Sequence, residues 1–175
     1  YNVVTNVAYE TLNNMHTEYA EMGKAFMNEF GKPLAIDEQD SLTYRASIIK
    51  YEQKKLVEAS NGFKKYLNAF PNGKYQLEAN NLVAEIAYAQ QQYDSAAFYF
   101  SKVADQSPNK FAERASLIAA RLYYFNFKEY TLAEKYFTSL NSIATQQENK
   151  NEALKGLLRC QYKAEKWVEC AIIAE

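Results

Sequence analysis

The stretch YDSAAFYFSKVADQSP, residues 93–108, has an aromatic residue at Tyr93, a small residue at Ala96 and a second aromatic at Phe100. Spacings of three and four residues place these side chains on one face of a helix. Pro108 follows the helix, where a missing amide donor ends it. The same spacing recurs 37 residues away in both directions along the chain. The stretch is therefore one copy of a repeated unit.

Three columns of residues carry this repeat. The first column is large and apolar or aromatic, the second is mostly small, and the third is mostly phenylalanine. The columns are Tyr19, Leu56, Tyr93, Tyr130 and Trp167; Met22, Ala59, Ala96, Ala133 and Cys170; and Phe26, Phe63, Phe100, Phe137 and Ala174. The small residue lets a second helix approach closely, and the phenylalanine one turn later fills the adjoining gap. We expect these columns to form the core.

A partner helix lies upstream in each unit. Its columns are Leu12, Ile49, Ile86, Tyr123 and Cys160 and, two residues on, Asn14, Tyr51, Tyr88, Phe125 and Tyr162. Breakers rich in Pro, Gly and Asn, or uniformly polar, separate the units at 31–33, 70–73, 107–109 and 145–149. The pattern predicts helices near 2–17, 20–30, 40–53, 56–69, 74–90, 93–106, 110–127, 130–146, 149–164 and 167–174.

The predicted unit is helix, tight turn, helix and linker. One such pair cannot bury its own apolar face, whereas stacked neighbours share a continuous core. We therefore predict an all-α fold, an α-solenoid with a 37-residue period that spans residues 1–175 as a single fragment. It comprises a degenerate pair at 1–39, units at 40–76, 77–113 and 114–150, and a truncated unit at 151–175.

The composition argues against some classes of function. The chain has 175 residues with 20 basic and 21 acidic side chains, a balance that argues against a general nucleic-acid surface. No apolar run is long enough to span a membrane, and no secretory signal precedes Tyr1. Because the chain begins without Met and stops in mid-pattern at Glu175, we interpret it as a piece of a longer protein.

The residues needed for catalysis are scarce. The single histidine, His16, is expected to be a packing or solvent-facing residue, and the sequence has no phosphate-binding loop, nucleophile elbow or zinc-protease motif. Glu78 and Glu85 share a helix face and are expected to be solvated charges, although a glycosidase pair is the alternative. Cys160 and Cys170 are expected to be small buried hydrophobes. We predict no catalytic residue, no metal and no cofactor.

The columns resemble the tetratricopeptide repeat. Its second helix has an aromatic residue, an alanine three residues later, a phenylalanine or tyrosine four residues after that, and then a proline. Tyr93, Ala96, Phe100 and Pro108 match this pattern. Tyr130, Ala133 and Phe137 match it without the proline. The resemblance covers residues 40–170 and implies a right-handed superhelix. The family usually repeats at 34 residues, and its first helix usually carries Trp and Gly, where this chain has Asn80 and Ala84, then Leu117 and Arg121. Because Arg121 suits a close contact poorly, we expect Ala120 to replace it, with the turn one residue longer.

The resemblance also implies a concave groove, lined by the first helices, that binds a peptide segment. By position, its residues are Tyr44, Ile48 and Tyr51; Asn81, Glu85 and Tyr88; Ile118, Leu122 and Phe125; and Lys155, Arg159 and Tyr162. Aromatic rings with a polar tip suit binding. Alternatively the rings pack one unit onto the next, or Phe125 lies in the core while Tyr88 and Tyr162 are partly open. Some members of the family bind acidic C-terminal tails through a set of lysines, asparagines and an arginine on the first helices. At the corresponding positions of two successive units in this chain, only Asn81 belongs to that set.

These observations predict a non-catalytic protein–protein interaction scaffold. Its partner is a protein or peptide, or another segment of the same longer chain, and we expect no nucleic-acid partner and no membrane span in this fragment. The alternatives are a glycan-binding or envelope-assembly accessory protein and, last, an enzyme on an α-solenoid frame. The long units and the linker AFPNGKYQLEA are similar to bacterial cell-envelope members of the family, of Bacteroidetes type. That implies a periplasmic or outer-membrane-associated location, with the cytoplasm as the alternative.

Overall fold

The computed structural model describes residues 36–165 and Ile172. Every regular element in this part of the chain is a helix, which confirms the predicted all-α class. The elements are α2 (Ile36–Glu52), α3 (Leu56–Ala69), α4 (Gln76–Ala89), α5 (Tyr93–Ala104), α6 (Ala112–Arg121), the π-helical segment η1 (Leu122–Phe127), α7 (Tyr130–Ile143) and α8 (Gln147–Lys163). The helices predicted at 2–17, 20–30 and 167–174, together with His16 and Cys170, lie outside the described residues.

Most of the predicted helices agree with these bounds to within a few residues, but two differ. The helix predicted at 40–53 begins at Ile36, and the helix predicted at 110–127 is an α-helix only as far as Arg121. The chain divides into two compact units, Tyr1–Gln39 and Asp40–Glu175. All contacts described below lie within the second unit.

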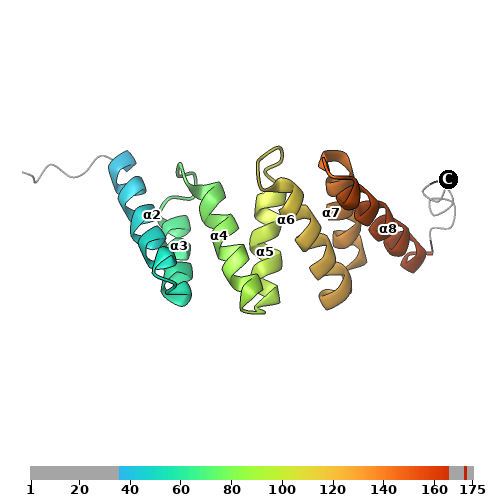
Figure 1. The fold of residues 1–175 in the computed structure, drawn as a ribbon, viewed down its shortest axis with the longest axis horizontal. Helices are drawn as coiled ribbons and strands as arrows, with labels where there is room; N and C mark the ends of the chain where they lie inside the picture. Colours follow the sequence, from blue (N-terminus) through green and yellow to red (C-terminus); the bar gives the residue numbers. More distant parts are fainter. Residues whose placement is uncertain (1–35, 166–171, 173–175) are drawn as a thin grey trace, which may run out of the picture. The chain divides into compact units, whose positions relative to one another are not determined.

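The helices pack mainly on their neighbours in the sequence. From α3 to α8, each helix contacts the next one along the chain, and α5 also contacts α7 as α6 contacts α8 (Figure 1). The rings of Tyr44 and Phe63, with centroids 5.7 Å apart, join α2 to α3. The core is therefore extended by each added helix.

The core consists of the columns that define the repeat. Ala59, Ala96 and Ala133 are fully buried, and so in effect are the phenylalanines four residues after each of them, Phe63, Phe100 and Phe137. One cluster of buried residues joins α2, α3 and α4 and another joins α4 to α8, and Tyr99 packs against both. Burying one phenylalanine side chain stabilises a fold by roughly 1.5–3 kcal/mol, so the three phenylalanines contribute substantially to the stability of the core.

The breakers predicted at 70–73 and 107–109 lie between helices, the one predicted at 145–149 overlaps the start of α8 at Gln147, and the one at 31–33 lies outside the described residues. Asn109 shows how such a junction is held. Its amide Nδ2 donates to the carbonyl oxygens of Val103 at 2.9 Å and Gln106 at 3.2 Å, and its Oδ1 accepts from the backbone amide of Phe111 at 2.8 Å. One side chain thus satisfies backbone groups at the end of α5 and ahead of α6, which helix termini leave without partners.

The turns inside the helix pairs share one conformation. Each contains a non-glycine residue in the left-handed region, with φ of 62° at Lys54, 58° at Gln91, 60° at Lys128 and 58° at Glu165. These residues are 37 positions apart along the chain. In the first two turns a backbone amide donates to the carbonyl oxygen five residues earlier and so closes the helix end. The amide of Lys55 donates to the carbonyl of Lys50 at 3.0 Å, and the amide of Gln92 donates to the carbonyl of Ala87 at 2.8 Å.

The third turn differs because its helix contains an extra residue. There the amide of Glu129 reaches back six residues to the carbonyl of Tyr123, at 2.9 Å. The π-helical segment η1 absorbs this residue, since a π-helical turn holds one residue more than an α-helical turn. Ala120, and not Arg121, consequently occupies the close contact that Ala84 makes in the preceding unit, as predicted: Ala84 and Ala120 are fully buried and Arg121 is exposed.

A buried carboxylate fastens the N-terminal end of the described core. Asp40 accepts hydrogen bonds from the Tyr66 hydroxyl at 2.6 Å and from the Lys74 backbone amide at 2.8 Å. The amide of Tyr75 in turn donates to the Tyr66 hydroxyl at 3.0 Å. Burial, and then the hydrogen bond to Asp40, raise the pKa of Tyr66 well above its ordinary value. These bonds connect α2, α3 and the linker into α4.

Replacing Gly156 with alanine should destabilise the fold. A Cβ at this position of α8 would overlap the buried ring of Phe137 on α7. Gly to Ala normally stabilises a helix interior by about 1 kcal/mol, but overpacking a core costs about 1–3 kcal/mol. Because the overlap here is with a buried ring, we expect the upper end of that cost and a net loss of about 2 kcal/mol. Urea unfolding at neutral pH measures it. Lys150→Ala, at an exposed position of α8, is the control, and a Gly156→Ala variant as stable as the wild type would contradict this packing.

The fold should also lose stability in alkali through Tyr44. Its ring stacks on that of Tyr75, with centroids 4.3 Å apart, and burial, followed by the charge of Glu78, raises its pKa to about 12. A pKa raised above the unfolded value of 10.0 contributes stability that is fully present below pH 10 and is lost between pH 10 and 12. Chemical denaturation of Tyr44→Phe at several pH values should show a shallower loss across this window. A slope equal to that of the wild type would be the contrary result.

Candidate functional site

The predicted groove residues lie on α2, α4, η1 and α8, with Ile118 alone on α6, and three of their aromatic rings are open to solvent. Tyr88 is 41% exposed, Phe125 49% and Tyr162 60%. Tyr44, Ile48 and Tyr51 on α2 are instead half-buried against the core cluster of α3 and α4. The aromatic column therefore forms an exposed set on α4, η1 and α8, which we call the aromatic face and define as Tyr88, Phe125 and Tyr162.

Two predictions about the third unit are wrong. Ile118 and Leu122, expected to line the groove, are buried in the core, with exposed fractions of 7% and 3%. Phe125, placed in the core by one of the alternatives, is exposed. The cause is the extra residue of η1: counted back from the turn at Lys128, the positions ahead of it lie one residue earlier than a constant 37-residue step assumes. Arg121, which is exposed, lies where Glu85 lies in the preceding unit.

Glu85 is held by an ion pair and is not simply solvated. Arg114 on α6 donates from Nε to one Glu85 oxygen at 2.6 Å and from its terminal nitrogen to the other at 3.0 Å. This two-point contact raises the pKa of Arg114. Lys110, just ahead of α6, makes a single contact with Glu78 at 3.0 Å, so both glutamates expected to be solvated charges pair with basic residues at or near the start of α6.

Polar contacts of the same kind link α6 to α8 and the residues just ahead of it. Arg121 pairs with Glu152 at 3.0 Å, and Glu113 accepts from the Thr145 hydroxyl at 2.9 Å and from Asn149 Nδ2 at 2.7 Å. The bond from Asn149, with those from Thr145, lowers the pKa of Glu113 although burial opposes it. Exposed pairs contribute about 1 kcal/mol or less each, so their effect here is to fix the spacing of the first helices.

The remaining predicted residues divide between the surface and the interior. Lys155 and Arg159 are exposed on α8, beside the partly open side chains of Leu154 and Leu158. Asn81 is buried on α4, and Cys160 is buried as predicted. The aromatic face thus has paired charges beside Tyr88 and basic side chains beside Tyr162.

The sequence reasoning missed a cavity on another part of the surface. It lies between α5, η1 and α7, has a volume of about 390 Å³, and is lined by Asp94, Ala97, Phe98, Tyr123, Phe127, Glu129 and Leu132. Two signals in the sequence mark it. Phe98 is an exposed aromatic on a second helix, and the run LYYFNF at 122–127 is richer in aromatics than the repeat requires.

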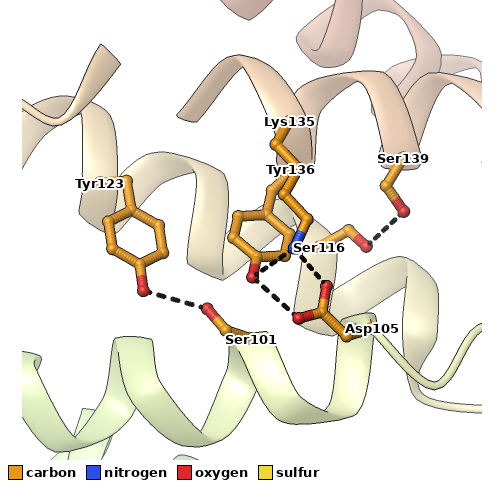
Figure 2. A network of polar contacts seen from close by, with 7 residues as sticks. All are labelled: Ser101, Asp105, Ser116, Tyr123, Lys135, Tyr136 and Ser139. Carbon is orange, nitrogen blue, oxygen red and sulfur yellow. Dashed lines mark hydrogen bonds and ion pairs between the residues drawn. The ribbon is translucent and has the colours of Figure 1, made fainter. Parts of the chain in front are cut away.

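A polar network sets one wall of this cavity (Figure 2). Ser101 donates to the Tyr123 hydroxyl at 3.2 Å, and the Tyr123 ring stacks on that of Tyr136, with centroids 5.6 Å apart and planes inclined by 11°. Tyr136 donates to Asp105 at 3.3 Å, and Lys135 pairs with the same carboxylate at 2.7 Å. The ion pair raises the pKa of Lys135. Tyr123 is therefore held both by its ring and by its hydroxyl.

Comparison with known proteins assigns no family. No protein-family profile matches the chain, and no curated protein is significantly similar to it. Within residues 36–165, no group of three or more His, Cys, Asp or Glu side chains is placed to hold a metal ion. None of the helices described is both long and apolar enough to cross a bilayer.

Proposed function

We propose that this protein is a non-catalytic interaction scaffold that docks a protein or peptide segment on its first helices. The frame of this proposal is an α-solenoid of tetratricopeptide-like pairs with a 37-residue period. Support comes from the left-handed turn residues at Lys54, Gln91, Lys128 and Glu165 and from the buried alanine and phenylalanine columns, both spaced at 37 residues. Two independent features, one in the backbone and one in the core, have the same spacing.

The observation that carries the proposal is the exposed aromatic face. Tyr88, Phe125 and Tyr162 come from successive first helices, and each leaves a large part of its ring in water. Complete burial of an aromatic side chain contributes about 1.5–3 kcal/mol, and these half-exposed side chains gain only part of it in the free protein. Tyrosine and phenylalanine on a rigid backbone are typical of binding hot spots, since few rotatable bonds are frozen on contact.

The charges beside the rings define the class of partner. Glu85 is neutralised by Arg114, and Glu152 by Arg121, so the α4 and α6 part of the face presents no strong net charge. On α8, Lys155 and Arg159 are exposed and take no part in the ion pairs of the described residues. The partner segment would therefore carry apolar or aromatic side chains for the rings and acidic residues toward α8.

Removing the rings should weaken the binding of such segments. Peptides are first selected from a random display library against the wild-type chain, and their affinities are then measured by fluorescence anisotropy. For the double variant Tyr88→Ala/Tyr162→Ala we expect affinity to fall at least roughly tenfold, because truncating one hot-spot aromatic costs about 2 kcal/mol or more. Selected peptides should also be enriched in Asp, Glu and aromatic residues.

The matched control is Phe98→Ala, which removes an equally exposed aromatic ring from a second helix. This variant should bind the selected peptides as the wild type does. Unchanged affinity in the double variant, with its unfolding transition intact, would refute docking on the aromatic face. A loss of affinity confined to Phe98→Ala would place the binding surface on the second helices.

A further inference from the structure

The cavity between α5, η1 and α7 combines two kinds of group. Phe98, Tyr123 and Phe127 supply aromatic rings, and Asp94 and Glu129 supply carboxylates. Its volume of about 390 Å³ lies within the range of small-ligand sites. It is separate from the aromatic face of the proposed function and does not depend on it.

The extra residue of η1 is what shapes this cavity. Tyr123 and Phe127 are both in η1, and their ring centroids are 5.9 Å apart with planes inclined by 53°. Segments of π-helix occur frequently at functional sites, where the added residue re-aims side chains. The hydrogen bond from Ser101 and the stacked ring of Tyr136 then hold Tyr123 in place (Figure 2). The position of Tyr123 in the aromatic wall is therefore fixed by the fold.

The carboxylates have no cationic partner in the described part of the chain. The acidic members of its ion pairs are Glu58, Glu78, Glu85, Asp105 and Glu152. Of the lysines near the cavity, Lys128 donates to the carbonyl oxygen of Phe125 at 2.7 Å. Lys102 places its Nζ 4.5 Å from the centroid of the Phe98 ring, so this ring already attracts one ammonium group.

We propose that this cavity binds an organic ammonium group. The faces of aromatic rings attract a cation while their bulk accommodates its alkyl substituents, and recognition of alkylated ammonium ligands by several rings follows from this combination. Asp94 and Glu129, both exposed to solvent, add a modest attraction for a cation that an uncharged ligand would not gain and that an anionic ligand would oppose. The group comes either from a free small amine or from a methylated lysine side chain of a partner.

Binding of choline is the direct test, with 3,3-dimethyl-1-butanol as the control. The two molecules have nearly the same shape and differ in charge, so their difference in affinity isolates the cationic contribution. We expect choline to shift amide resonances of α5, η1 and α7 in ¹H–¹⁵N spectra, and to bind roughly tenfold or more tightly than the neutral analogue. Equal affinity of the two, or no shift with choline at tens of millimolar, would overturn the proposal.

Variants then test the residues. Phe98→Ala, and separately Asp94→Asn/Glu129→Gln, should each weaken choline binding roughly fivefold or more, while Tyr162→Ala on the aromatic face should leave it unchanged. Unaltered choline affinity in the carboxylate variant would count against the site. A trimethyllysine peptide that binds more tightly than choline identifies a protein side chain as the source, and the reverse order identifies a free amine; both support an ammonium site.

Discussion

The close approach of neighbouring helices at small side chains is the constraint on which this structure depends. Ala59, Ala96 and Ala133 are fully buried, and Gly156 lies so near the ring of Phe137 that a methyl group would not fit. Because each contact joins neighbours in the sequence, the core is built from short-range interactions. This leaves the solvent-facing sides of the helices free to vary, since they contribute little to the packing.

The spacing of the repeat was enough to predict the helices and most of the core. The alanine and phenylalanine columns are buried because both residue types occur where two helices meet, and the breakers predicted at 70–73 and 107–109 lie between helices. The start of α2 was placed too late because its first residues, Ile36 to Gln39, are exposed and follow no apolar period. The predicted solenoid arrangement and its period remain part of the proposed function.

The candidate site was harder to predict than the fold, for a physical reason. A column of residues assumes a constant number of residues per turn, and η1 breaks that assumption within one unit. Ile118 and Leu122 were predicted to line the groove and are buried. The prediction that Ala120 replaces Arg121 at the close helix contact was correct, because only the smaller side chain suits a buried position there. The cavity between α5 and α7 was missed because it is formed by side chains from three elements, which no single column of residues brings together.

The π-helical segment also bears on how such a chain can change over generations. An additional residue inside an α-helix would normally rotate all that follows by about 100°, which would turn an apolar face outward. Here the rotation is confined to Leu122–Phe127, and Ala133 and Phe137 on α7 are still buried. A π-helical turn at the end of a first helix can therefore present different side chains to solvent while the buried columns on either side are preserved. The ends of the first helices are thus places where the surface can change without repacking the core.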